Sequence, residues 1–187
     1  ERKLEVAERI YHLAVDECGL QPQDLVFDDL TFTLATGEEV YRNSAVETLR
    51  GITLIKQTLP GVHTSLGVSN VSFGLSPASR KVVNSVFLYH AVAAGLDMAI
   101  VNPAQIKPYA EIPQQERELA EALIFNKHEN ALADLIAYFD ANPEAVGDDG
   151  QKVDLLEGLS ASERLRERIL RRQKLGVEED IDSILAE

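Results

Sequence analysis

Three short apolar segments alternate with amphipathic helices in this chain of 187 residues, and each segment ends in a polar side chain. Alternating strands and helices with short connections are typical of parallel βα units. Because the carboxyl ends of parallel strands meet at one edge of the sheet, the three polar endings are expected to lie together, where α/β proteins bind ligands. The segments and their endings are Leu25–Phe27 with Asp28, Val62–Val68 with Ser69 and Asn70, and Met98–Val101 with Asn102.

The helices around these strands carry recognisable start and stop signals. Ser44 and Glu47 have the spacing of a capping box, in which the two side chains satisfy backbone N–H groups at a helix start. Ser76 before Pro77 predicts an N-cap followed by the first helical residue, and Gly95 is placed to end the same helix in a left-handed conformation. Helices are therefore predicted at residues 2–18, 44–59 and 77–94.

After Pro113 the alternation of strands and helices gives way to helices alone. Two helices are predicted at residues 114–125 and 128–141, followed by a linker at residues 142–152 that is rich in Pro, Gly and Asp. A second capping box, Ser160 with Glu163, predicts a helix that continues to Gly176, and a short further helix is expected at residues 177–186.

Three parallel strands do not make a complete sheet protein by themselves. Strands of this apolar kind need cover on both faces, and an isolated sheet leaves its edges open. A complete (β/α)8 barrel takes about 250 residues, so a chain of this length could supply only the last part of one. The chain also begins with Glu1 and not with Met, as expected of a piece cut from something longer.

Composition excludes several functional classes. The net charge of −13 disfavours binding to nucleic acid or to an anionic membrane, because phosphates would be repelled. Cys18 is the single cysteine, which rules out a disulfide framework or a thiolate metal cluster, and the four histidines share no metal-ligand spacing, so no metal site is expected. No apolar run approaches the roughly 18 residues that a membrane-spanning helix needs.

The segment Gly67–Gly74, with the sequence GVSNVSFG, places the polar pair Ser69-Asn70 between an apolar strand and a helix start. An asparagine amide offers one acceptor and two donors without carrying charge, so Asn70 can follow a nitrogen atom through a change of protonation. The alternative, that Asn70 only makes the turn, stays open on local sequence. The segment lacks the spacing of phosphate-binding glycine loops, and no neighbouring His and Asp suggest a catalytic triad.

The stretches FDDLTFTLATG at 27–37 and LGVSNVSFGLSPASRKVVNSVFLYHAVAAGLDMAIVNPAQI at 66–106 closely resemble the pterin-binding domain of the cobalamin-dependent methionine synthases, within the wider group of methyltetrahydrofolate:corrinoid methyltransferases. The GVSNVSFG and DMAIVN segments, with the FLYHAV helix between them, make the resemblance specific. It implies a TIM barrel, of which residues 1–125 would be roughly strands six to eight with their helices. Residues 126–155 would be a helix and linker, and residues 156–187 the start of the helical cap of the cobalamin-binding module.

The resemblance also implies roles for individual residues. Asp28 matches an aspartate that pairs with the ring NH and amino group of the pterin, a bidentate contact that suits a carboxylate. Its neighbour Asp29 is the better candidate for a simple turn or cap. Asn70 matches the asparagine that contacts N5 of methyltetrahydrofolate, and Asn102 matches a position on the last strand that lines the pocket. Phe73 is either a pterin contact or, as is commoner for an aromatic residue after a strand, part of the core.

The reaction that the resemblance implies is transfer of the N5 methyl group of 5-methyltetrahydrofolate to a cob(I)alamin cofactor, en route to homocysteine and methionine. A tertiary amine is a poor leaving group unless N5 is protonated, so the site should favour the protonated form more strongly in the transition state. Asn70 is the expected catalytic residue, because its carbonyl oxygen can stabilise N5–H⁺ electrostatically. A side-chain amide does not titrate, so the proton is expected to come from water or a hydrogen-bond network.

Other parts of such an enzyme are missing from this sequence. The first five or so strands, the cysteine zinc site for homocysteine and the Asp-x-His-x-x-Gly corrinoid motif are absent. Cobalamin, zinc and homocysteine are therefore expected on neighbouring domains of a longer, cytoplasmic chain, and this piece is not expected to act alone. The family commonly has Pro-Asn where this chain has Asp29-Leu30, so the loop is expected to differ locally.

Two other functions stay open. A related pterin barrel, dihydropteroate synthase, would be expected to carry a basic site for pyrophosphate near these strand ends, and only Arg80-Lys81 come close. The third hypothesis is a non-catalytic module that binds a pterin or a partner helix.

Overall fold

The computed structural model describes residues 2–142, 159–170 and 176–186. The chain divides into two compact units, residues 1–146 and residues 147–187. Within the described ranges, none of the helices combines the length and the apolar character needed to cross a membrane.

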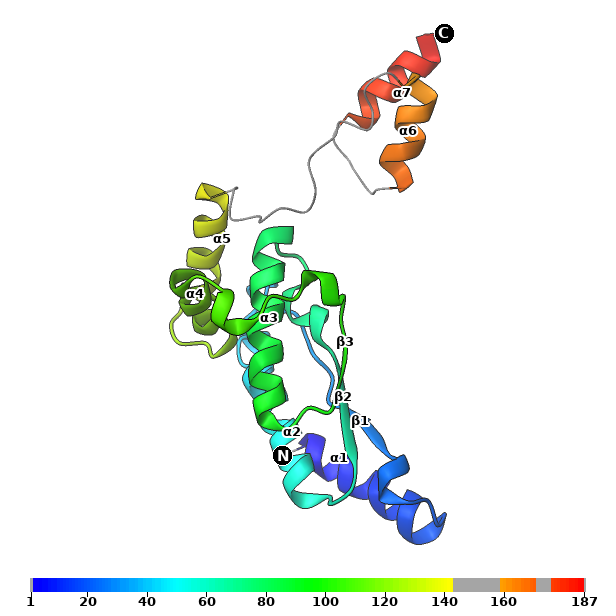
Figure 1. Ribbon diagram of the computed structural model, residues 1–187, viewed down its shortest axis with the longest axis vertical. Coiled ribbons are helices and arrows are strands. Elements are labelled where there is room, and N and C mark those ends of the chain that lie inside the picture. The colour runs from blue at the N-terminus through cyan, green and yellow to red at the C-terminus, as the bar shows by residue number, and fades with distance from the viewer. Residues whose placement is uncertain (1, 143–158, 171–175, 187) are drawn as a thin grey trace. The chain divides into compact units, whose positions relative to one another are not determined.

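The first unit contains a three-stranded parallel sheet in the order β1-β2-β3 (Figure 1). The strands are β1 (Val26–Asp28), β2 (His63–Gly67) and β3 (Met98–Ile100). Asp28 pairs with Ser65 between β1 and β2, and Gly67 pairs with Ile100 between β2 and β3. The predicted parallel βα units are therefore confirmed, and all three strands end at the same edge of the sheet.

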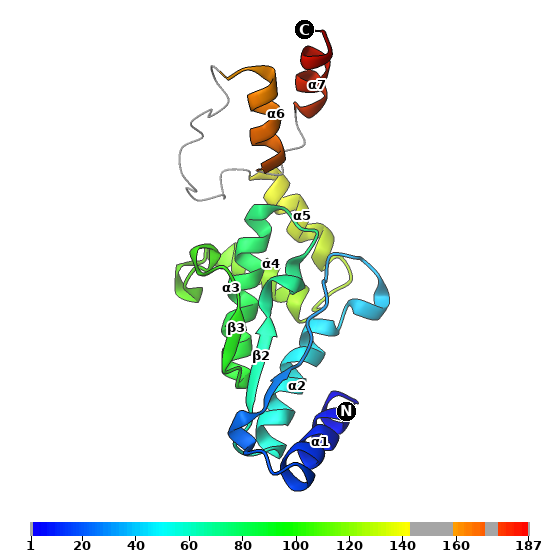
Figure 2. The same ribbon diagram turned by 90° about the vertical axis from the view of Figure 1, so that its right-hand side faces the viewer.

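Among the described residues of the first unit, five α-helices surround or follow this sheet: α1 (Arg2–Tyr11), α2 (Ser44–Thr58), α3 (Pro77–Ala94), α4 (Gln114–Ile124) and α5 (Ala131–Ala141). A π-helical turn at His12–Glu17 continues α1, and Figure 2 shows α1 beside α2. The predicted ends of α3 are confirmed, because the Ser76 hydroxyl accepts the Ser79 N–H and Gly95 has φ of 109°.

The predicted capping box at the start of α2 is wrong. Asn43 occupies the N-cap position, and its carbonyl accepts the first helical hydrogen bond from the Glu47 N–H. Ser44 is already helical, and its hydroxyl donates to the Tyr41 carbonyl at 2.7 Å. A short 3-10 turn at Glu39–Tyr41 leads directly into the helix, so the Ser44 hydroxyl bonds backward to this turn.

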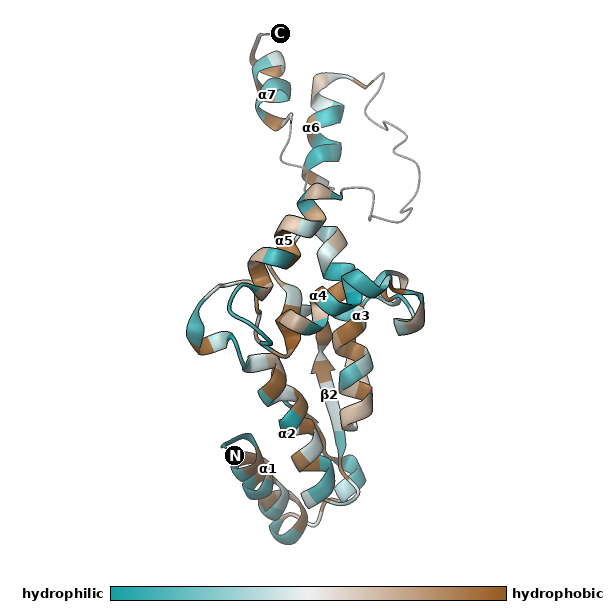
Figure 3. Ribbon diagram, turned by 90° about the vertical axis from the view of Figure 1, so that its left-hand side faces the viewer, coloured by the Kyte–Doolittle hydropathy of each residue, from teal (hydrophilic) through white to brown (hydrophobic). Residues whose placement is uncertain are grey.

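One face of the sheet packs on the helices and holds the core. Along β2, Thr64 and Leu66 are buried, whereas His63, Ser65 and Gly67 on the opposite face are only half-buried. Leu66 joins a cluster with apolar residues of α2, α3, α4 and α5, whose brown segments recur along these helices in Figure 3. The fully buried residues that α3 contributes to this cluster include Val82, Val83, Val86 and Phe87.

The other face of the sheet is called here the open face; its residues are Val26, Asp28, His63, Ser65, Gly67, Met98 and Ile100. They share a face because paired residues of parallel strands point the same way and successive residues alternate. Figure 1 shows α2 and α3 on the opposite side of the strands, and no described helix covers the open face. Its apolar side chains are accordingly exposed: Val26 by 51%, Met98 by 42% and Ile100 by 69%.

The second unit contains α6 (Ala161–Leu170) and α7 (Val177–Ala186). The predicted capping box before α6 is confirmed, since Glu163 accepts the Ser160 N–H at 2.9 Å and the Ser160 hydroxyl accepts the Glu163 N–H at 3.4 Å. Arg164 and Arg168 of α6 both donate to the buried carboxylate of Asp180, each at 2.7 Å, which ties the two helices together. The predicted linker lies outside the described residues except for residue 142, as do residues 171–175 of the predicted helix before Gly176.

Candidate functional site

Asp28 is the last residue of β1 and its side chain is exposed on the open face. One carboxylate oxygen accepts the Leu30 N–H at 2.9 Å, an Asx-type turn that fixes the side chain relative to the backbone. The second oxygen and the remaining lone pairs stay available for a ligand. The turn role that the sequence suggested for Asp29 therefore belongs to Asp28.

Asp29 is buried instead, with its side chain 1% exposed and 3.5 Å from the ammonium group of Lys3. The carboxylate packs against α2 at Gly51, where a Cβ atom would overlap it. Burial raises the pKa of Asp29 to about 6, although the positive charge and hydrogen bond of Lys3 act in the opposite direction. Asp29 thus anchors the end of β1 to the helices through its buried carboxylate.

Asn70 lies in a 3-10 turn, Val68–Ser72, that follows β2 directly. A Cβ atom on Gly67 would lie 3.0 Å from Nδ2 of Asn70, so the amide sits over the side of Gly67 that faces the open face. Asn70 is exposed, and its side chain makes no hydrogen bond among the described residues. Its acceptor and both donors are therefore available.

A buried polar network holds this turn from below. The Arg80 guanidinium of α3 donates to the Ser69 carbonyl and to the Ser72 hydroxyl, both at 3.2 Å. The Ser72 hydroxyl in turn donates to the Asn84 side-chain oxygen at 2.7 Å. Ser72 and Asn84 are 0% and 4% exposed, so these bonds fix the backbone that presents Asn70.

Asn102 follows β3 at the same edge, but part of its side chain is used locally. Its Oδ1 atom accepts the Ala104 N–H at 3.1 Å and so caps a short 3-10 turn, Pro103–Gln105. The residue is exposed, and its amide donors make no hydrogen bond among the described residues. Asn102 can therefore offer donors to a ligand but has less free acceptor capacity than Asn70.

The strand register brings Asp28 and Asn70 close together on the open face. Asp28 of β1 pairs with Ser65 of β2. Gly67, over which the Asn70 amide lies, is two residues after Ser65 on the same strand. With strands about 4.8 Å apart and a rise of about 3.3 Å per residue, the backbones of Asp28 and Gly67 are about 8 Å apart. The Asp28 carboxylate and the Asn70 amide therefore border the same edge of the open face.

Phe73 is not a core residue, which corrects one of the two interpretations of its sequence position. Its side chain is 68% exposed at the end of the Asn70 turn. The Thr33 hydroxyl donates to the Phe73 carbonyl at 2.5 Å and joins this turn to the loop after β1. The exposed ring is therefore available at the same edge of the sheet.

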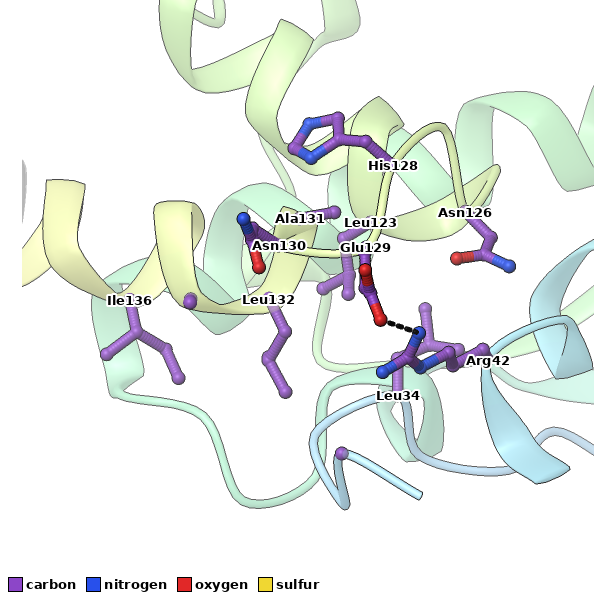
Figure 4. A pocket seen from close by; sticks show the side chains of 12 residues that line it. Leu34, Arg42, Leu123, Asn126, His128, Glu129, Asn130, Ala131, Leu132 and Ile136 are labelled. Carbon is purple, nitrogen blue, oxygen red and sulfur yellow. Dashed lines mark ion pairs between the residues drawn. The ribbon is translucent and has the colours of Figure 1, made fainter. Parts of the chain in front are cut away.

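A separate pocket of about 280 Å³ lies between the loop after β1 and the junction of α4 with α5 (Figure 4). Its floor is apolar, with Leu34, Leu132 and Ile136, and at its rim Arg42 and Glu129 approach to 4.0 Å. None of Asp28, Asn70 and Asn102 lines it. The pocket and the sheet edge are thus different sites.

Two residues of the site escaped the sequence analysis. Lys3 reaches the turn after β1. Its sequence position could have indicated this inward orientation, because Lys3 lies four residues before the buried Ala7 and therefore on the same face of α1. Gly67 provides the space for the Asn70 amide, and a glycine at the end of a strand was the only hint. Among the described residues, no group of three or more His, Cys, Asp or Glu side chains could hold a metal ion.

Comparison with known proteins identifies the family of this chain. The family model described as pterin binding enzyme matches residues 1–102, which include all three strands and Asp28, Asn70 and Asn102. Methionine synthase of Mycobacterium tuberculosis is 36% identical over the whole of this chain, and methionine synthase of Mycobacterium leprae is 35% identical. The chain spans only 16% of the length of each of these relatives. This chain belongs to the pterin binding enzyme family.

Proposed function

We propose that this chain is part of a methyltransferase that binds 5-methyltetrahydrofolate and passes its N5 methyl group to cob(I)alamin, en route to homocysteine and methionine. The observation that carries the proposal is the placement of Asp28 and Asn70 at the carboxyl ends of neighbouring parallel strands, both toward the open face. The similarity to two methionine synthases supports the choice of reaction.

Asp28 would bind the amino-pyrimidine edge of the pterin. That edge presents two adjacent N–H donors, and an exposed carboxylate can accept both at once. The bond from the Leu30 N–H leaves the second oxygen unoccupied and holds the carboxylate in one orientation. Asp28 would therefore set the orientation of the ring and, with it, the direction in which N5 points.

Asn70 would act on N5. The side-chain amide of Asn70 has no hydrogen-bond partner among the described residues. Its oxygen can therefore accept a hydrogen bond from a protonated N5 without breaking an existing bond. The carbonyl oxygen interacts more strongly with N5–H⁺ than with neutral N5, and this difference lowers the barrier to departure of the methyl group. Asn102 and the exposed ring of Phe73 would line the rest of the pterin site.

The open face fits a partial barrel, the last three βα units of a (β/α)8 fold. In such a barrel the open face would point to the interior, where apolar side chains such as Val26 and Ile100 are normally buried in layers. Both outer strands would pair with strands supplied by other parts of the protein. Residues 1–125 would form this part of the barrel, and α6 and α7 would begin the helical cap of a cobalamin-binding module.

The methyl acceptor would be the reduced cobalt of a corrinoid held by a neighbouring domain. This sequence has no Asp-x-His-x-x-Gly motif with which to hold it, and zinc and homocysteine would also be bound elsewhere in the protein. A dihydropteroate synthase is less well supported, because the guanidinium of Arg80 is engaged by Ser69 and Ser72 and is not presented for pyrophosphate.

The test is a titration of the intact protein with 5-methyltetrahydrofolate, together with a single-turnover assay of methyl transfer. Replacing Asn70 by Ala should leave affinity within about threefold and slow transfer by roughly a hundredfold, as expected for a lost transition-state interaction. Asn142→Ala, which alters an exposed asparagine at the end of α5, is the matched control. An intact protein that binds the folate without any turnover would instead support the non-catalytic module.

A further inference from the structure

The turn that follows Asp28 has an unfavourable backbone conformation. Leu30 has φ of 52°, in the left-handed region that residues with a Cβ atom rarely adopt, and its side chain is 60% exposed. Packing of the leucine side chain therefore does not explain the conformation. Something else must hold the backbone of Asp29 and Leu30 in place.

Lys3 of α1 supplies these contacts. Its ammonium group lies 2.6 Å from the Asp29 carbonyl, 3.3 Å from the Leu30 carbonyl and 3.0 Å from the Thr48 hydroxyl. The Thr48 hydroxyl of α2, itself fully buried, lies 3.0 Å from the same Leu30 carbonyl. The turn is thus held from two helices through its own carbonyl groups.

The same turn fixes the ligand-binding carboxylate. The Asp29 carbonyl that Lys3 holds belongs to the same planar peptide group as the Leu30 N–H, which is directed at Asp28, whose Oδ1 accepts it at 2.9 Å. Lys3 and Thr48 also hold the Leu30 carbonyl, on the far side of the same residue. Lys3 makes no hydrogen bond or ion pair with Asp28 among the described residues. Its influence on Asp28 must therefore pass through the backbone of Leu30.

We propose that Lys3 is a positioning residue for pterin binding, which orients the Asp28 carboxylate by holding the Asp29–Leu30 turn. This inference rests on the proposed function for its ligand, because Asp28 is the residue assigned to the pterin edge. A carboxylate that must meet two donors at once depends on its orientation more strongly than one that makes a single contact. Loss of Lys3 should therefore weaken folate binding although Lys3 does not touch the folate.

Lys56 offers a matched control at the opposite, amino-terminal end of the sheet. Like Lys3, it reaches from a helix to a backbone carbonyl, that of Val62 at 2.9 Å, and to a carboxylate, that of Asp97 at 2.9 Å. The two side chains are 32% and 30% exposed. Replacing either lysine by Met removes a charge and a similar set of bonds, but only Lys3 is connected to Asp28.

The first experiment measures folate affinity in a double-mutant cycle in the intact protein. Lys3→Met should raise the Kd for 5-methyltetrahydrofolate roughly tenfold when Asp28 is present and less than about twofold in an Asp28→Asn background. Lys56→Met should leave the Kd unchanged. An equal loss with and without Asp28, or an equal loss for Lys56→Met, would overturn the proposal.

The second experiment does not need the folate. Hydrogen–deuterium exchange of the peptide that spans residues 26–31 should accelerate severalfold in Lys3→Met and in Thr48→Val, because the Leu30 N–H loses its fixed acceptor. Lys56→Met should not change this exchange. If exchange is the same in all variants, the positioning role is wrong even if the protein binds folate. If the wild-type protein binds no folate, the proposed function fails, and the exchange experiment alone decides whether Lys3 orients Asp28.

Discussion

The amide of Asn70 lies directly over Gly67, so that a Cβ atom on Gly67 would approach Nδ2 of Asn70 to 3.0 Å. This contact places the amide on the same face of the sheet as Asp28, which pairs with Ser65 two residues earlier on β2. Because Gly67 has no side chain, the side chain of Asn70, in the turn after β2, can fold back over the open face. The position of the Asn70 amide therefore depends on the absence of a side chain at Gly67.

Gly67→Ala should slow single-turnover methyl transfer by the intact protein roughly tenfold, or about 1.4 kcal/mol, and leave folate affinity within about threefold, because the new methyl group displaces the Asn70 amide. The backbone at Gly67 has φ of −77°, which alanine adopts without strain, so the melting temperature should change little. The check is a single-turnover assay of methyl transfer paired with a thermal melt. In an Asn70→Ala background the same substitution should cost nothing further, and an equal loss there would contradict the role of the contact.

Arg80→Met should loosen the turn that carries Asn70, because the guanidinium holds the Ser69 carbonyl and the Ser72 hydroxyl. We expect faster hydrogen–deuterium exchange across residues 68–72 and roughly tenfold slower methyl transfer. Lys81→Met, at the neighbouring position on α3, is the control and should change neither quantity. If exchange across residues 68–72 is slower or unchanged in Arg80→Met, the hydrogen bond between Ser72 and Asn84 is enough to hold the turn without Arg80.

The raised pKa of Asp29 predicts that the free energy of unfolding falls as the pH rises. Its pKa in the folded protein is raised to about 6 from an ordinary value of 3.8, mainly by burial and against the effect of Lys3. Between these two pH values the folded protein therefore binds more protons at Asp29 than the unfolded protein does. The contribution of this group to stability is therefore full below pH 3.8 and is lost as the pH rises through about 6.

The measurement compares urea unfolding of the wild-type protein and Asp29→Asn between pH 4 and pH 7. The free energy of unfolding of the wild-type protein should fall with rising pH relative to that of the variant, which cannot titrate at this position. Parallel curves for the two proteins would mean that the Asp29 carboxyl is ionised throughout, and that its burial beside Lys3 does not raise its pKa.

A substitution of Asp97 is expected to lower the stability of the protein without changing its folate affinity. At the amino-terminal end of β3 it accepts hydrogen bonds from Lys56 and, at 2.8 Å, from the Thr64 N–H of β2. Although partial burial raises its pKa, these bonds hold the value below the usual range. Asp97→Ala should therefore lower the free energy of unfolding by about 1–3 kcal/mol and leave folate affinity unchanged. Asp140→Ala, an exposed aspartate of α5, should change neither, and a folate defect in Asp97→Ala would argue against a site confined to the carboxyl edge.

The alternation of strands and helices was predictable because it depends on local signals. Apolar runs bounded by polar residues marked β1 and β3, and Ser76, Pro77 and Gly95 marked both ends of α3 within the chain itself. The position of Asp28 at the end of β1 followed from the same pattern. These features need only neighbours in sequence, and they predicted that the three polar endings share one edge of the sheet, as they do in the structure.

The features that escaped prediction depend on residues far apart in the chain. Asp29 is buried because Lys3 and Gly51 meet it from two different helices, and nothing adjacent to it in sequence records either contact. Phe73 is exposed because the core beneath its turn is filled by Val68 and Val71 and by residues of α3. Helix α2 begins at Ser44 and not after it because a preceding turn supplies Asn43 as the cap.

The most direct test of the central claim is a crystal structure of the intact protein with 5-methyltetrahydrofolate bound. We expect the pteridine ring on the open face, with its amino-pyrimidine edge on the Asp28 carboxylate and N5 within hydrogen-bond reach of the Asn70 amide. A pteridine ring seated in the pocket between Leu34 and Ile136, or one that contacts neither Asp28 nor Asn70, would contradict it.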